Sequence, residues 1–112
     1  MRHALVRSLI QHFLERAGYT GTFHVYLSAQ RYDAMRRRKG LGPEDSVQDR
    51  DMACVLTGVR APVFYVNASA HSTVRQLVDS CAHEAVHVVR PDMRHGVEFK
   101  KLVRSLLRGE TL

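Results

Sequence analysis

Two histidines and a glutamate in the second half of the chain have the spacing of a hydrolytic metal site. Residues 83–87 read His83-Glu84-Ala85-Val86-His87, an H-E-x-x-H run. Residues four apart lie on one face of an α-helix, about one turn from each other, so the two imidazoles can bind one metal ion. The glutamate can take a proton from a water that the metal polarises. The run therefore predicts a zinc site with His83 and His87 as ligands and Glu84 as the general base.

A third ligand is expected, because catalytic zinc has three protein ligands and one open position. His95 comes just after the break at Pro91-Asp92, and Gly96 after it would leave room for close backbone approach. Glu98 lies one turn further along the same expected helix, where an exposed carboxylate is also favoured by the helix dipole. We expect His95 to complete the site, with Glu98 as the alternative ligand.

The H-E-x-x-H run lies within an apolar pattern that predicts an amphipathic helix from Thr73 to Val89. Apolar residues recur in this segment at spacings of three and four residues. Ser72 is the expected N-cap, and Pro91 prevents the helix from continuing beyond about Arg90. The motif would then lie near the C-terminal end of this metal helix. An ordinary surface helix with two solvated histidines is the competing interpretation.

The other segments predict one small α+β domain over residues 1–112, of which 45% are hydrophobic, ample for a single core. An apolar stripe from Leu5 to Leu14 predicts an N-terminal helix that ends at Gly18. Three β-rich runs predict strands, and the last two form a hairpin. The expected strands are Phe23 to Ser28, Met52 to Thr57 and Val63 to Asn67.

The segments between the first and second strands are less regular. Ala29 to Lys39 predicts a short basic helix or an extended arm, and Gly40 to Asp51 predicts a loop with glycine and proline breakers. The main elements then follow the order αβββαα. They would form a three-stranded mixed sheet, the metal helix and a closing helix.

The expected strand order suggests how a substrate would be held. The strand from Val63 to Asn67 leads directly into the metal helix, so we expect it at the centre of the sheet. The strand from Met52 to Thr57 would then be an antiparallel edge strand that borders the metal cleft. An open edge strand can hold an extended peptide by backbone hydrogen bonds. The loop from Gly40 to Asp51 covering this edge is the alternative.

The two histidine motifs together resemble the core of SprT-like zinc metallopeptidases and of related minimal zincins, such as the WLM and YgjP-like families. The resemblance covers about residues 60–108. It rests on His83, Glu84, His87, His95, Gly96, Phe99, Lys100 and Leu102. It implies a zincin-like fold in which His83, His87 and His95 bind zinc and Glu84 is the base. It also implies proteolysis near DNA, including removal of proteins crosslinked to DNA.

The chain carries a formal charge of +6, and its bases are unevenly distributed. One cluster consists of Arg36, Arg37, Arg38 and Lys39 together with the nearby Arg31, and a second lies in the last quarter of the chain. Basic clusters attract phosphate backbones without reading sequence. We expect nonspecific contact of the first cluster with DNA. A solvated basic face that aids solubility is the competing interpretation.

The two cysteines and the hydropathy of the chain indicate the cellular compartment of the protein. Cys54 and Cys81 lack the spacing of metal ligands and are expected to be reduced, buried thiols. The apolar N-terminal stripe is interrupted by Arg7, Gln11 and His12, so it does not resemble a signal peptide. No apolar run approaches the roughly 18 residues of a membrane span. We therefore expect a cytoplasmic protein without a membrane partner.

These observations predict a zinc metallopeptidase whose partner is a protein or peptide substrate. Glu84 would accept a proton from the metal-polarised water and pass it to the leaving amine. Asp79, one turn before His83, could orient that ligand. Three residues are considered as further donors to the oxyanion: Tyr65, His71 and Arg94.

Two other functions stay open at this point. One is a nucleic-acid-binding adaptor whose zinc site is structural or vestigial. The other is a zinc hydrolase that acts on a non-peptide amide. A structural site would close with a fourth protein ligand, which argues against the adaptor.

Overall fold

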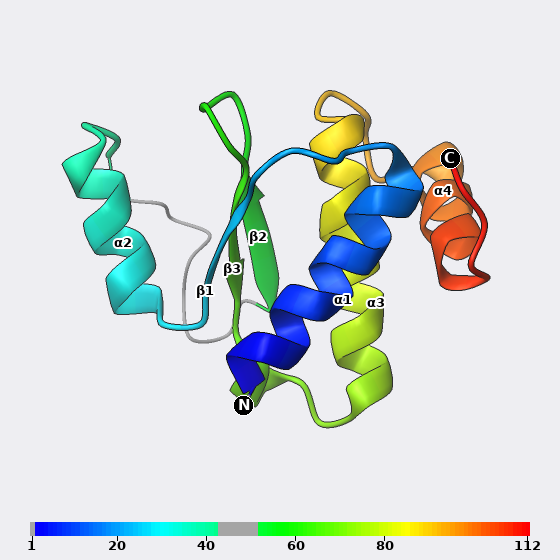
Figure 1. Cartoon of the computed structure of the whole chain (residues 1–112), viewed down its shortest axis with the longest axis horizontal. Helices are drawn as coiled ribbons and strands as arrows, with labels where there is room; N and C mark the ends of the chain where they lie inside the picture. Colours follow the sequence, from blue (N-terminus) through cyan, green and yellow to red (C-terminus); the bar gives the residue numbers. More distant parts are fainter. Residues whose placement is uncertain (1, 43–51) are drawn as a thin grey trace.

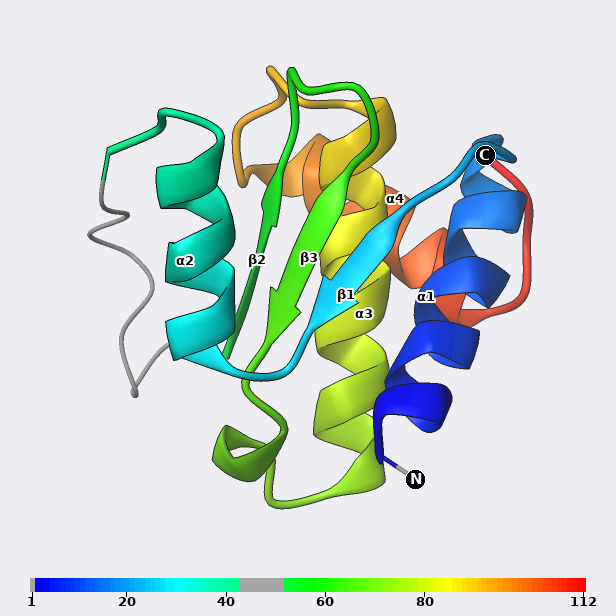
Figure 2. The same ribbon diagram turned by 60° about the vertical axis from the view of Figure 1, so that its left-hand side comes forward.

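A sheet of three short strands forms the centre of the protein (Figure 1). The computed structural model describes residues 2–42 and 52–112. The strands β1 (His24–Tyr26), β2 (Ala53–Leu56) and β3 (Val63–Val66) lie in the order β1-β3-β2. β3 pairs in parallel with β1 and antiparallel with β2, and Figure 2 shows it between them. The predicted mixed sheet with a central third strand is confirmed, although each strand is shorter than expected.

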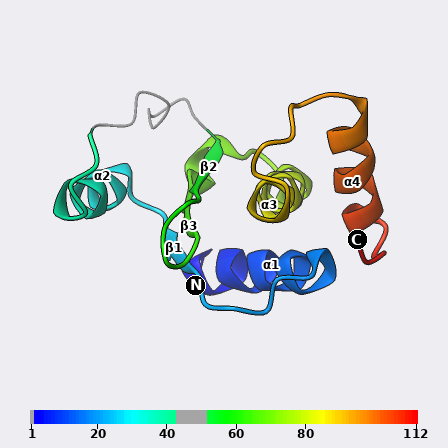
Figure 3. The same ribbon diagram turned by 90° about the horizontal axis from the view of Figure 1, so that it is seen from above.

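Helices cover both faces of the sheet (Figure 3). α1 (Arg2–Ala17) and α3 (Val74–Val89) pack on one face, and α2 (Ala29–Arg38) lies on the other. α4 (Val97–Leu107) packs against α3 on the side away from the sheet. A short 3-10 helix, η1 (Ala68–Ala70), connects β3 to α3. α3 therefore lies between the sheet and α4, which is the position from which it can present residues to both.

The central strand is buried on both faces. Phe64 and Val66 pack into the main core with α1 and α3, whereas Val63 and Tyr65 pack into a smaller cluster under α2. None of these four side chains is more than 2% exposed. A strand buried on both faces has a continuous apolar sequence rather than an alternating one, as residues 63–66 have.

The predicted order αβββαα is wrong, because the segment after β1 forms the helix α2 and the described elements follow the order αβαββαα. Ser28 begins α2, since its side chain accepts a hydrogen bond from the backbone N–H of Arg31. Tyr32 and Met35, three residues apart, are the buried residues that attach α2 to the sheet. Two apolar anchors in a basic segment give only a weak helical pattern, so the sequence is compatible with either a helix or an extended arm.

The ends of the metal helix are close to those expected. Thr73 caps α3, because its side chain accepts a hydrogen bond from the backbone N–H of Gln76. The predicted N-cap, Ser72, is wrong by one residue, and its hydroxyl donates to the side chain of Gln76 instead. α3 ends at Val89, two residues before Pro91, as predicted.

The loop expected from Gly40 to Asp51 is described only as far as Gly42, and the rest of it lies outside the described residues. No helix in the described ranges combines the length and apolar character that crossing a membrane requires.

Candidate metal centre

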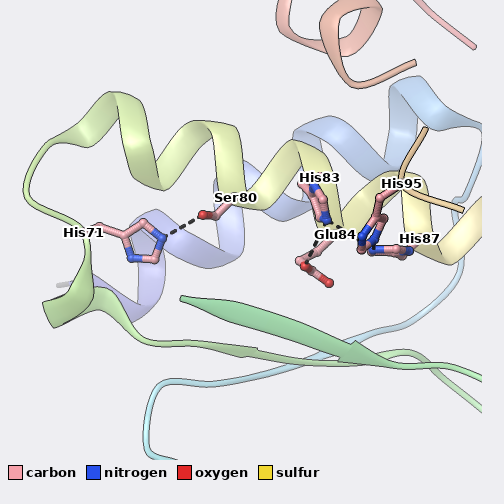
Figure 4. Close-up of polar contacts among 6 residues, drawn as sticks. All are labelled: His71, Ser80, His83, Glu84, His87 and His95. Carbon is pink, nitrogen blue, oxygen red and sulfur yellow. Dashed lines mark hydrogen bonds and ion pairs between the residues drawn. The ribbon is translucent and has the colours of Figure 1, made fainter. Parts of the chain in front are cut away.

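Three imidazoles meet beside the C-terminal half of α3 (Figure 4). His83 and His87 come from successive turns of α3, and His95 comes from the segment just before α4. Nε2 of His87 lies 3.2 Å from Nε2 of His83 and 2.7 Å from Nε2 of His95. The three predicted ligands are therefore brought close enough together to bind one metal ion.

One of the two measured nitrogen separations matches a tetrahedral metal site. Zinc–nitrogen bonds of about 2.0–2.1 Å place two tetrahedral nitrogens about 3.3 Å apart. The nitrogens of His83 and His87 are 3.2 Å apart, whereas those of His87 and His95, at 2.7 Å, lie closer together than in such a site. Imidazole ligands suit zinc, and they also suit copper, iron and nickel. The donors thus fit zinc without distinguishing it from these ions. Three protein donors leave one tetrahedral position for a water or a substrate.

The segment between α3 and α4 turns the chain so that His95 faces α3. α3 is capped by Arg90, whose carbonyl accepts a hydrogen bond from the backbone N–H of Met93. A further short turn joins Gly96 N–H to the carbonyl of Arg94 at 2.7 Å. The expectation that Gly96 provides room for close approach is wrong. Its φ is −105°, and a Cβ at this position would meet no atom within 4 Å.

Phe99 supports all three imidazoles from one side. Its ring centroid lies 4.7 Å from those of His83 and His87 and 5.0 Å from that of His95. These are distances at which aromatic rings pack favourably, and Phe99 is only 1% exposed. The first turn of α4 therefore holds the ligand rings in place. Spacing rules alone give no sign of this role, and Phe99 entered the sequence analysis only through the family resemblance.

Glu84 is the buried carboxylate of the site. It is 6% exposed, and its Oε1 lies 4.0 Å from Nε2 of His83. Figure 4 shows its side chain on the sheet side of α3, next to the imidazoles. Burial raises the pKa of Glu84 to about 7, because the charged form loses its hydration. A carboxyl with this pKa can both accept and release a proton at neutral pH.

The two histidines on α3 are poised to bind metal rather than protons. Burial, reinforced by repulsion from His95, lowers the pKa of His83. Burial, reinforced by His83 and His95, lowers the pKa of His87 to about 4. Both imidazoles are therefore neutral at pH 7, which is the form that donates a lone pair to a metal.

A cleft of about 330 Å³ opens beside the imidazoles on the side of the sheet. Residues of β2 form one wall, and the metal-site residues with Pro91 form the other. The predicted edge strand that borders the cleft is therefore confirmed. Its lining residues are Ala53, Cys54, Val55, Thr57, His83, Glu84, His87, Pro91 and His95.

The alternative ligand Glu98 lies apart from the imidazoles. It is in the first turn of α4, exposed, with Oε1 3.7 Å from Nζ of Lys101. It does not belong to the group of converging donors found among the described residues. Asp79 lines a groove between α3 and α4, and in the described part of the chain no hydrogen bond joins it to His83.

The residues considered as oxyanion donors do not line the cleft. His71 lies at the other end of α3, where Nδ1 contacts the carbonyl of Asn67 at 2.7 Å and Nε2 contacts Oγ of Ser80 at 2.8 Å (Figure 4). Tyr65 is buried on the opposite face of the sheet, with its ring 5.7 Å from that of Tyr32. Arg94 is exposed in the turn before His95.

The basic cluster lies across the sheet from the metal centre. Arg36, Arg37 and Arg38 form the last turn of α2, and Lys39 is its C-cap. Arg37, Arg38 and Lys39 are exposed, while Arg36 is half-buried and its Nε donates to the carbonyl of Gly42. The cluster therefore presents three exposed cations on the face opposite to α3.

Neither cysteine forms a disulfide. Cys81 is fully buried, as predicted. Its burial, and to a smaller extent the nearby charge of Glu84, raises the pKa of its thiol to about 12. Cys54 is only half-buried, because it lies on the edge strand β2 at the wall of the cleft.

No protein-family model, curated protein or solved structure matches the chain.

Proposed function

We propose that the protein is a zinc-dependent metallopeptidase that hydrolyses peptide bonds of protein or peptide substrates. The observation that carries this proposal is the buried Glu84 beside three converging imidazoles at an open cleft. A structural zinc site has four protein ligands and no use for a buried base. The three-histidine set therefore favours hydrolysis over a nucleic-acid-binding adaptor with a structural zinc.

Each residue of the site has a distinct part in this reaction. His83, His87 and His95 would hold the ion through their ring nitrogens. Bound zinc would supply a Lewis acid that polarises a water molecule and the substrate carbonyl. Glu84 takes a proton from the water as the water oxygen bonds to the carbonyl carbon. It then delivers a proton to the amide nitrogen as the C–N bond breaks.

The cleft wall favours a polypeptide over a small amide. β2 is an edge strand in the sheet order, and its residues line the cleft directly opposite Glu84 and the imidazoles. An extended chain can pair with the outer backbone groups of such a strand. Backbone pairing places a peptide bond near the site without selecting side chains. A small non-peptide amide would gain nothing from this edge.

The basic cluster on α2 adds a second component to the proposal. Exposed Arg37, Arg38 and Lys39 can neutralise phosphates without reading sequence. DNA would then concentrate the enzyme and DNA-bound proteins on one scaffold. Proteins associated with DNA are accordingly the substrates we propose for the full activity.

Casein hydrolysis measured with controlled metal content tests the proposal. We expect about one zinc per chain, loss of hydrolysis when a chelator removes the metal, and recovery when one equivalent of zinc is returned. Hydrolysis that persists after metal removal would contradict a metal-dependent enzyme. Cleavage of small amides without cleavage of casein would instead indicate the non-peptide hydrolase.

A further inference from the structure

A second groove opens on the other side of the metal centre, between α3 and α4. It has a volume of about 460 Å³, larger than the cleft at β2. His83 and His95 line both hollows. The two hollows therefore adjoin at these imidazoles, beside the place proposed for the scissile peptide bond.

The lining of the groove combines an apolar floor with a basic rim. Phe99, Val103 and Leu107 on α4 contribute the apolar surface. Leu107 is 39% exposed, so its side chain is accessible to an apolar group that enters the groove.

The rim of the groove is positively charged. Arg75, Lys100 and Arg104 are exposed along its edges, against one acidic lining residue, Asp79. Within the described ranges, none of these three cations takes part in an ion pair. The rim therefore favours a carboxylate on whatever enters the groove.

Two other occupants fit this groove poorly. The C-terminus is held elsewhere, because the backbone N–H of Leu112 donates to the carbonyl of Arg16 on α1. A second copy of the chain would bring a net charge of +6 to an already basic rim. Charge complementarity therefore points to an apolar segment that carries an acidic residue.

We propose that this groove is a substrate subsite. It takes a large aliphatic side chain of the substrate residue next to the scissile bond, and its basic rim contacts an acidic residue adjacent to that aliphatic residue in the substrate. The subsite rests on the proposed peptidase function. It adds a preference that the backbone edge of β2 does not supply, since pairing with β2 is indifferent to side chains. The occupant would be a polypeptide containing a leucine next to an aspartate or glutamate.

Peptide binding measured by fluorescence anisotropy tests the subsite. The protein is zinc-loaded Glu84→Gln, which keeps the ligands but does not consume the peptide. Three labelled peptides are compared, and they differ only at two adjacent central positions. These positions hold leucine–glutamate in the first peptide, alanine–glutamate in the second and leucine–lysine in the third. We expect the first to bind about tenfold more tightly than the second, because leucine buries more apolar surface. It should bind about threefold more tightly than the third at low salt.

Two matched pairs of variants test whether these peptide preferences arise in the groove. Lys100→Glu should reverse the preference for glutamate over lysine, whereas Lys101→Glu, the same change at the next residue outside the groove, should not. Leu107→Ser should remove the preference for leucine over alanine. Leu5→Ser, which changes another exposed leucine on α1, should leave that preference intact.

The outcomes separate the subsite from the peptidase function. Equal binding of the three peptides, or equal effects within each pair of variants, would overturn the subsite even if the wild-type protein cleaves casein. Selective binding with the expected variant effects, but no cleavage of the leucine–glutamate peptide by wild type, would support the groove as a binding site and overturn the proposed hydrolysis.

Discussion

The ring of Phe99 packs against the imidazole of His87 with 4.7 Å between the ring centroids. These residues come from different helices, so this contact couples the position of α4 to the geometry of the metal ligands. Groups around the ligands of a metal fix their ring orientation and tune metal affinity, and Phe99 can do so here by packing. The closing helix thus contributes to the candidate metal centre although none of the three histidines lies on it.

This coupling predicts that Phe99→Leu weakens zinc binding by about tenfold while the ligands remain. Leucine preserves much of the buried volume but not the flat surface against the three imidazoles. A competition titration with a chromophoric chelator measures the affinity. Phe13→Leu is the matched control, because Phe13 is equally buried in α1, away from the site. Equal zinc affinities of the two variants would contradict the supporting role of Phe99.

The position of His95 predicts the third ligand. His95→Ala should reduce zinc affinity by about 100-fold or more, since it removes one of three ligands. Glu98→Ala should leave the affinity unchanged, because Glu98 lies beside Lys101 and apart from the imidazoles. Metal content after dialysis gives the answer for both. A larger loss in Glu98→Ala would assign the site to two histidines and a glutamate.

The pKa of Glu84 predicts how pH affects the stability of the metal-free protein. Burial raises this pKa from 4.5 to about 7, so the folded state binds more protons than the unfolded state between these values. The contribution of protonated Glu84 to the free energy of unfolding is fully present at low pH and is lost as the pH rises through 7. Glu84→Gln cannot ionise, so its stability relative to wild type should increase by up to about 3 kcal/mol between pH 4 and pH 8.

Urea unfolding of both metal-free proteins at pH 4 and pH 8 measures this difference. The histidines titrate in both proteins, so their contribution cancels in the comparison. A stability difference that is the same at the two pH values would show that Glu84 ionises normally in the folded state.

The basic cluster predicts salt-dependent DNA binding. Each phosphate neutralised contributes about 0.9 to the slope of log affinity against log salt concentration for duplex DNA. Reversing the charge of Arg37, Arg38 and Lys39 should therefore flatten this slope by about three, without changing the zinc content. Fluorescence anisotropy at several salt concentrations tests this. An unchanged slope would leave these residues as a solvated basic face.

The convergence of the three histidines could be predicted from the sequence because it depends on local rules. Four-residue spacing on a helix brings His83 and His87 together, and the break at Pro91 allows the chain to return with His95. α2 cannot be assigned from the sequence alone, because only two buried residues, Tyr32 and Met35, mark its inner face. The order of the sheet could be predicted because β2 and β3 are neighbours in the chain and β3 is the last strand before α3.

The supporting parts of the site depend on tertiary packing and could not be predicted in this way. The angle at which α4 crosses α3 decides that Phe99 lies under the imidazoles and that Leu107 lines a groove. His71 was expected at the site and lies outside it. It is near the metal helix in sequence, yet it contacts Ser80, about one helical turn before His83, and does not line the cleft.

The most direct test of the account is the rate of casein hydrolysis by zinc-loaded Glu84→Gln relative to wild type at equal zinc content. Glu15→Gln is the control, because it makes the same chemical change at an exposed position on α1. The account predicts that Glu84→Gln retains about one zinc per chain and loses hydrolysis by about 10²- to 10⁴-fold, while Glu15→Gln keeps the wild-type rate. Hydrolysis by Glu84→Gln at the rate of Glu15→Gln would contradict the assignment of Glu84 as the base, and with it the proposed mechanism.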